Sequence, residues 1–234
     1  MQRAPAVIAL AAALAAASGC ADVDGLRNDG DLGTVRAPLT LWKDIRPAPP
    51  GPGGTTGAAA VVPGLPKVPA LTMRGVDPLA VVRADITSAT AQDGGTGRLP
   101  DPRAAQRLAL CTGAADADCP VRPGVLHDLT GDGREELITA VDIDGRVSEL
   151  RVYTVRYDGS VARVLSRTAV LEGVEVAAEH LAVREPTSNP DYVSVSDYVW
   201  DPDAGIMNLS QLTLDECPAL SETPLRTDGA RCAR

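Results

Sequence analysis

The stretch LITAVDIDGRVSELRVYTVRYDG, residues 137–159, contains the strongest secondary-structure signals in this chain. Residues 137–141 form a β-rich apolar run, and the Asp144-Gly145 dipeptide strongly favours a tight hairpin turn. From residue 147 to 157 the side chains alternate in character, which is the two-residue period of a strand with two unlike faces. Asp158-Gly159 is a second hairpin signal. The stretch therefore predicts consecutive antiparallel strands joined by tight turns.

Further strand patterns follow toward the C-terminus, at residues 161–171, 174–184, 192–200 and 206–214. Two helices are expected before the sheet. The first is a run over 79–86 and the second a run that ends at Leu110, and each is opened by an Asp-Pro pair that suits a helix start. We therefore expect an α+β fold, with two N-terminal helices followed by an antiparallel β-meander of about six strands.

The folded domain is expected to cover residues 73–234, because residues 20–72 have the composition of a tether. Between Ile45 and Pro69 about half of the residues are Pro or Gly, which favours neither helix nor sheet. Leu39 to Trp42 is a small apolar island within the tether. Docking of this island on the domain and independent recognition of a partner are both open.

The first twenty residues have the layout of an export signal that ends in a cysteine. Met1 to Arg3 carries one positive charge, and residues 6–17 are an apolar run too short to span a bilayer permanently. The segment Ala17-Ser18-Gly19-Cys20 resembles the bacterial lipobox, although that motif usually has leucine where Ala17 stands. The resemblance implies that residues 1–19 are a removed signal peptide. It also implies a lipid anchor on Cys20, which would hold the protein in the cell membrane on the extracytoplasmic face.

Four further cysteines remain in the chain, at Cys111, Cys119, Cys217 and Cys232. An even number of cysteines in an exported chain indicates two disulfides. Three pairings are possible, and the local one, Cys111 with Cys119 and Cys217 with Cys232, is preferred. A zinc site is disfavoured, because the chain has no Cys-x-x-Cys motif and its two histidines are His127 and His180.

Composition limits the partners and the core. A net charge of −9 without a basic cluster argues against a nucleic-acid partner, since phosphate contacts need Lys and Arg on one face. Phenylalanine is absent, and five of the six Tyr and Trp residues fall in predicted strands: Tyr153, Tyr157, Tyr192, Tyr198 and Trp200. These rings are either the large pieces of the core or an exposed aromatic platform for sugar or protein.

The sharpest chemical motif is DLTGDGREEL, residues 128–137. Oxygen-bearing side chains occur at Asp128, Thr130, Asp132 and Glu136, and two glycines let the chain wrap tightly. Because Ca²⁺ takes several oxygens at about 2.3–2.6 Å, these side chains and the carbonyl of Arg134 form a candidate calcium site. The alternative is a rigid turn whose carboxylates bond backbone N–H groups.

This loop resembles the calcium loop of FG-GAP and VCBS repeats, through Asp128, Gly131, Asp132, Gly133 and the strand that starts at Leu137. Thr130 and Glu136 depart from that pattern, which has Asn or Asp at the first position and Asp at the second. On a wider scale the chain resembles actinobacterial lipoproteins of the CseA type, through Cys20, Cys111 and the Asp128-Leu129-Thr130-Gly131 segment. That resemblance implies a regulator of envelope stress that works with a membrane sensor kinase.

No catalytic residue is assigned. A Ser-His-Asp hydrolase needs a histidine beside an activated serine, and the sequence has no Gly-x-Ser-x-Gly elbow. His127 and Asp128 point to opposite faces if their segment is extended. We therefore expect a non-enzymatic binding or regulatory module, with a sensor kinase or a cell-wall component as its partner. The alternatives are a calcium-dependent FG-GAP-like surface module and a cell-wall hydrolase.

Overall fold

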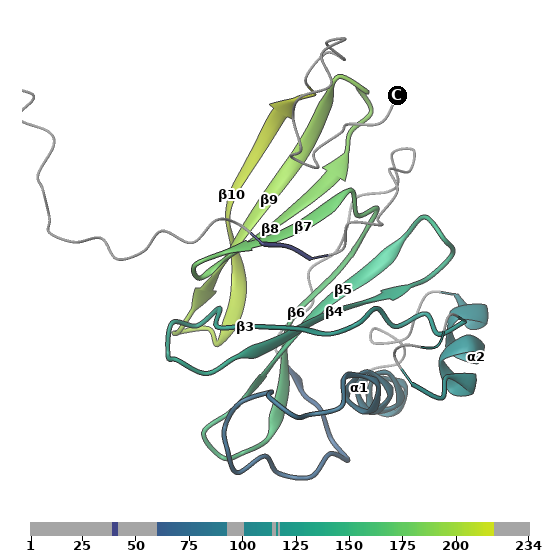
Figure 1. Ribbon diagram of the computed structural model, residues 1–234, viewed down its shortest axis with the longest axis vertical. Helices are drawn as coiled ribbons and strands as arrows, with labels where there is room; N and C mark the ends of the chain where they lie inside the picture. The colour runs from purple at the N-terminus through teal and green to yellow at the C-terminus, as the bar shows by residue number, and fades with distance from the viewer. Residues whose placement is uncertain (1–38, 42–59, 93–100, 114–115, 117, 218–234) are drawn as a thin grey trace, which may run out of the picture. The chain divides into compact units, whose positions relative to one another are not determined.

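The computed structural model describes residues 39–41, 60–92, 101–113, 116 and 118–217. Within these residues it has two helices and ten strands, and every strand pair is antiparallel (Figure 1). The helices are α1 (Pro78–Gln92) and α2 (Pro102–Leu110). The strands are β1 (Leu39–Thr40), β2 (Ala60–Val61), β3 (Val125–His127), β4 (Glu136–Asp142), β5 (Ser148–Val155), β6 (Val161–Ala169), β7 (Gly173–Ala177), β8 (His180–Pro186), β9 (Tyr192–Asp201) and β10 (Ile206–Glu216). The predicted α+β class is confirmed.

The strands form two sheets, which corrects the single meander of about six strands that the sequence predicts. The central sheet has the order β2-β6-β5-β4-β3, and the outer sheet has the order β1-β7-β8-β9-β10. Each sheet contains one meander of four consecutive strands, β3 to β6 or β7 to β10. The chain passes between the sheets after β6, where Val170 and Leu171 are both buried instead of alternating. Stacking the meanders buries an apolar face of each, which a single wide sheet would leave exposed.

The strand predicted at 174–184 is a hairpin. Ala177 of β7 pairs with His180 of β8, so Ala178 and Glu179 form the turn between them. Ala178 has a φ of 50°, which residues other than glycine adopt infrequently. Because neither turn residue is one that favours turns, the local sequence gives no signal of the reversal.

Residues 60–72 belong to the folded domain, which corrects the predicted boundary at residue 73. β2 pairs with β6, Val62 is 3% exposed, and the backbone N–H of Val68 donates to the carbonyl oxygen of Gly159 (2.8 Å). Burial of Val62 and partial burial of Leu65 and Val68 offset the unfavourable Pro and Gly content of this segment. β1 pairs with β7, so residues 39–41 of the apolar island dock on the outer sheet. Trp42, the rest of the tether and the predicted signal peptide lie outside the described residues.

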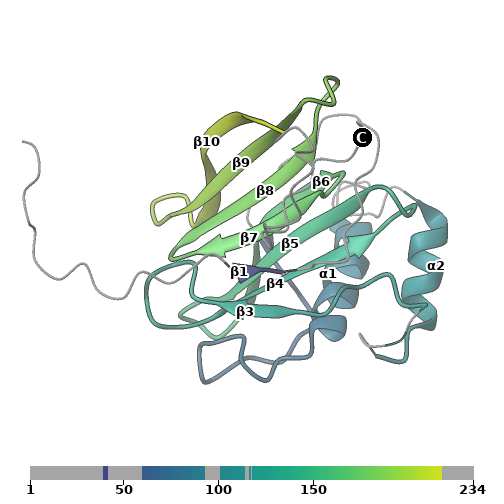
Figure 2. The same cartoon turned by 45° about the horizontal axis from the view of Figure 1, so that its top comes forward.

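Two side-chain layers cover the two faces of the central sheet. Leu150 and Val152 of β5 pack against the outer sheet in an apolar cluster. Tyr153 and Val155 point the other way and pack in a second cluster with apolar residues of α1 and α2. Figures 1 and 2 show both helices on the side of the central sheet that faces away from β7–β10. The alternation predicted along residues 147–157 is thereby confirmed.

Candidate functional site

The acidic loop links β3 to β4 and is organised by its first carboxylate. Asp128 accepts the backbone N–H of Gly131 through one oxygen (2.8 Å) and that of Gly133 through the other (2.8 Å). Both glycines have positive φ, and a Cβ on Gly131 would lie 2.8 Å from Oε1 of Glu179 in the β7–β8 turn. A side chain at Gly131 would therefore meet both backbone strain and a steric contact.

Arg134 closes the loop over Asp132. The Asp132 carboxylate accepts the backbone N–H (2.9 Å) and the Nε–H (2.8 Å) of Arg134, and these bonds hold the pKa of Asp132 below its usual value. The same guanidinium lies 4.9 Å from the centre of the Tyr157 ring, in a cation–π arrangement. The loop thus fixes the position of an aromatic ring that belongs to the β5–β6 turn.

Glu136 lies beneath the loop and is 2% exposed. One carboxylate oxygen accepts the backbone N–H of Leu129 (2.8 Å), and the other accepts the hydroxyl of Thr154 (2.9 Å). Burial is the largest influence on this group and raises the pKa of Glu136 to about 7. The carboxyl therefore changes charge near neutral pH.

The predicted calcium ligands share one loop, but their oxygens are engaged inside the protein. Asp128 and Glu136 each use both carboxylate oxygens in hydrogen bonds, and Arg134 occupies Asp132. The Thr130 hydroxyl lies 3.5 Å from Asp128. Among the described residues there is no group of three or more acidic, histidine or cysteine side chains placed to hold an ion. This hydrogen bonding matches the alternative of a rigid turn, and calcium binding by the loop stays a prediction.

A cleft of about 800 Å³ opens beside this loop. Three segments far apart in the sequence line most of it: the acidic loop through Asp132 and Arg134, the β5–β6 turn through residues 156–158, and the end of β9 with its following turn, residues 200–205. A cleft of this size is in the range of small-molecule sites, which combine apolar walls with a few polar groups.

The aromatic residues of the predicted strands fall into a buried group and a group that lies at the surface. Tyr153 and Tyr198 are fully buried and belong to the core. Tyr157 is 86% exposed, and Trp200 is half-buried; both line the cleft. Tyr192 lies at the other end of β9 and donates its hydroxyl to Glu216 (3.2 Å). Tyr153 and Tyr198 thus take the predicted core role, and the platform role stays a prediction for Tyr157 and Trp200.

Among the described residues, neither histidine forms a hydrogen bond with a serine hydroxyl. His180 Nδ1 donates to Asp197 (2.8 Å), and the Ser210 hydroxyl donates to the same carboxylate oxygen (3.2 Å). In a hydrolase the histidine stands between serine and aspartate, whereas here the aspartate stands between them. His127 donates through Nε2 to the carbonyl oxygen of Ala178 (2.6 Å). This arrangement does not activate Ser210 as a nucleophile.

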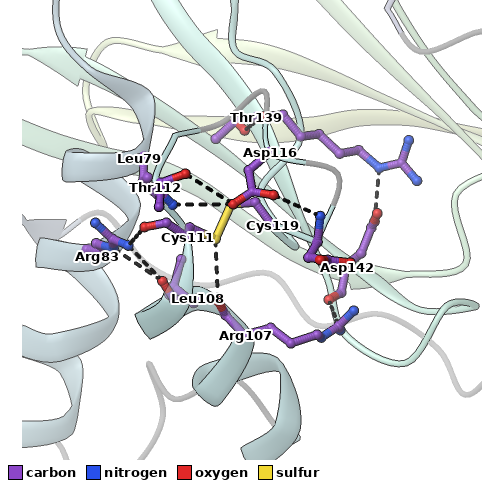
Figure 3. The surroundings of a disulfide bond; sticks show 12 residues. Leu79, Arg83, Arg107, Leu108, Cys111, Thr112, Asp116, Cys119, Thr139 and Asp142 are labelled. Atoms are coloured by element: carbon purple, nitrogen blue, oxygen red, sulfur yellow. Dashed lines mark hydrogen bonds and ion pairs between the residues drawn. A yellow bond between two sulfur atoms is a disulfide. The ribbon is translucent and has the colours of Figure 1, made fainter.

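A disulfide joins Cys111 at the end of α2 to Cys119, as predicted (Figure 3). Arg83 of α1 donates to the carbonyl oxygens of Leu108 (3.0 Å) and Cys111, and Arg107 donates to the carbonyl of Asp142 at the end of β4 (3.0 Å). The disulfide loop is therefore tied to both α1 and the central sheet. Cys217 is disulfide-bonded as well. Its predicted partner, Cys232, and the lipidation residue, Cys20, lie outside the described residues.

A cluster of buried charged residues lies under α1, and the sequence analysis does not predict it. Asp85 is 3% exposed and accepts hydrogen bonds from Arg151, from Arg163 (2.8 Å) and from the hydroxyl of Tyr153 (2.9 Å). Arg151 also lies 3.0 Å from Glu149 as an ion pair. One sequence signal could have indicated that Asp85 is buried. It follows the buried Val81 and Val82 at helical spacing, which places it on the same face of α1. The cluster ties α1 to the central sheet and does not reach the cleft.

No protein-family model, curated protein or solved structure matches this chain. In the described part of the chain, neither helix has the length and apolar character to cross a membrane.

Proposed function

We propose that this chain is a lipid-anchored lipoprotein whose folded domain acts as a non-enzymatic binding module on the extracytoplasmic face of the cell membrane. The observation that carries this proposal is the Cys111–Cys119 disulfide, taken together with the lipobox-like segment before Cys20. Disulfides persist in oxidising compartments and are rare in the cytosol, so the pair supports export of the domain.

Metabolic labelling with a palmitate analogue tests the anchor. The wild-type chain should carry the label in the membrane fraction, whereas Cys20→Ser should not. Cys111→Ser is the matched control, since it removes a cysteine from the folded domain and should leave the label in place. An unlabelled wild type, or a label that survives Cys20→Ser, would refute the anchor.

The cleft beside the acidic loop supplies the binding surface in this proposal. It joins two aromatic rings to charged groups on three turns. The resemblance to the CseA type supports a regulatory role in envelope stress, in which the cleft would hold the recognised molecule. Cross-linking in native membranes, followed by purification, distinguishes between the candidate partners. Recovery of a sensor kinase supports regulation, and recovery of cell-wall material supports a wall-binding role.

A further inference from the structure

The cleft contains one aromatic ring that has no role in the folded core. Tyr157 is 86% exposed, although large aromatic side chains usually contribute burial energy to a protein of this size. Its ring is held in place from one side by Arg134, which is itself fixed by Asp132. An exposed ring that is already positioned loses little conformational entropy when a ligand stacks on it.

The second ring, Trp200, provides a wall of the same cleft. Its indole is half-buried and packs against the cluster between the two sheets, so its position is set by the core. An amphipathic ring of this kind offers an apolar face to a ligand and an N–H donor at its edge.

The charged groups of the cleft are close to balance. Asp132 is paired with Arg134, and Asp158 is paired with Lys67 (2.9 Å). Two charged side chains remain, Arg156 and Asp203, and neither makes a hydrogen bond or ion pair with the described part of the chain. A cleft with one unpaired cation and one unpaired anion selects a ligand without net charge that both donates and accepts hydrogen bonds.

We infer that the cleft binds a neutral oligosaccharide, an inference that rests on the proposed binding function and names its ligand class. The C–H face of a sugar ring is apolar and stacks on aromatic rings, while its hydroxyls can donate to Asp203 and accept from Arg156. A polyanion is disfavoured by the net charge of −9. A proline-rich peptide also docks on aromatic grooves, but each proline lacks an N–H, so such a peptide offers Asp203 fewer donors than the hydroxyls of a sugar do.

Calorimetric titration of the purified full chain in detergent tests this inference. The probes are chitotetraose and cellotetraose, which are uncharged, and a proline-rich decapeptide. We expect one or both sugars to bind, and Tyr157→Ala to weaken that binding by about tenfold or more, as truncation of a central aromatic contact does. Asp203→Asn should weaken it by a smaller factor. Tyr192→Ala is the matched control, since this tyrosine lies outside the cleft and its loss should leave the affinity unchanged.

Three results would overturn the inference. The first is that neither sugar gives binding heat with a chain that still melts cooperatively. The second is that Tyr157→Ala binds the sugar as tightly as the wild type does, and the third is that the cleft binds the peptide more tightly than the sugars. The titration does not depend on lipidation. A chain that binds sugar but never carries the palmitate label would therefore refute the anchor alone, and a labelled chain that ignores both sugars would refute the ligand class alone.

Discussion

Two groups of carboxylates in this molecule are satisfied in different ways. In the acidic loop, Asp128 and Asp132 accept hydrogen bonds from backbone N–H groups and an arginine no more than five residues away. Asp85 is buried under α1 and is held by Arg151 and Arg163, which lie 66 and 78 residues further along the chain. The first group shapes one loop, whereas the second fixes a helix on a sheet.

Exposed and buried carboxylates contribute differently to stability. Water can replace the partners of an exposed carboxylate, so its hydrogen bonds contribute little net free energy. The partners of a buried carboxylate cannot be replaced in this way. Removal of Asp85 takes a buried partner from Arg163 and from Arg151, although Arg151 keeps its ion pair with Glu149. We therefore expect substitutions under α1 to act on the whole fold, and substitutions in the acidic loop to act locally.

The largest effect is expected at Asp85. Asp85→Ala should lower the free energy of unfolding by about 3–5 kcal/mol, because Arg151 and Arg163 lose their shared buried partner. Asp215→Ala is the control, since its ion pair with Arg184 (3.1 Å) is half-exposed and should contribute less than about 1 kcal/mol. Urea denaturation measures both. If Asp85→Ala does not fold, Asp85→Asn keeps an acceptor and should be intermediate. Equal losses at the two sites would contradict the comparison.

The second-largest loss of stability is expected when the Cys111–Cys119 disulfide is removed. Replacing Cys111 and Cys119 together by serine releases a short loop in the unfolded chain and should lower stability by about 2–3 kcal/mol. Because Arg83 and Arg107 still anchor the end of α2, the variant should keep the native fold. Circular dichroism and urea denaturation, with the oxidised wild type as the reference, check this expectation. A double variant that unfolds as the wild type does would show that the helices need no covalent tie.

The buried carboxyl of Glu136 should make the free energy of unfolding depend on pH. Burial raises the pKa of Glu136 to about 7, above the usual 4.5, so the folded state holds this proton more tightly than the unfolded chain. The resulting stability is fully present below about pH 4.5 and is lost as the pH rises through about 7. Glu136→Gln keeps an acceptor for the Leu129 N–H and a group that can pair with Thr154, but it does not titrate.

The stability of Glu136→Gln relative to the wild type should therefore rise between about pH 4 and about pH 8, by about 3 kcal/mol. Unfolding free energies measured across this range give the difference directly, and the other titrating groups cancel between the two chains. Parallel curves for the two chains would show that the buried carboxyl keeps its usual pKa.

Calcium should have the smallest effect. Since the oxygens of Asp128 and Asp132 are already engaged, added Ca²⁺ should leave the melting temperature of the full chain unchanged. Asp132→Ala should respond in the same way as the wild type. A rise in melting temperature with Ca²⁺ that Asp132→Ala abolishes would revive the calcium-dependent surface module as the function of this loop.

Several parts of the fold could be predicted because their signals are local. The turns at Asp144-Gly145 and Asp158-Gly159 occur where the dipeptides indicate, and both glycines have positive φ. The start of α2 was also readable, since the side chain of Asp101 accepts the N–H of Arg103 (2.8 Å) ahead of a helix that begins with proline. The hairpin at Ala178 could not be predicted, because the two residues of its turn carry no turn signal and its contact with His127 joins residues 51 positions apart.

The candidate site also has one part that could be predicted from the sequence and one part that could not. The hydrogen-bonded loop at residues 128–136 follows a ten-residue motif and was available from the sequence. The cleft was not, since it exists only where turns some 45 residues apart, at Tyr157 and Asp203, meet beside that loop. The partners of Asp85 are likewise chosen by topology. A pattern of neighbours along the chain contains no information on which strand will face which helix.

The most direct test of the central claim, that this domain works outside the cytoplasm on a lipid anchor, is mass spectrometry of the protein purified from its own membranes. We predict a chain that begins at Cys20, carries fatty acyl groups on that residue, and contains Cys111 and Cys119 in the oxidised, linked form. A chain that still begins at Met1, with no acyl groups and with reduced thiols at both positions, would contradict it.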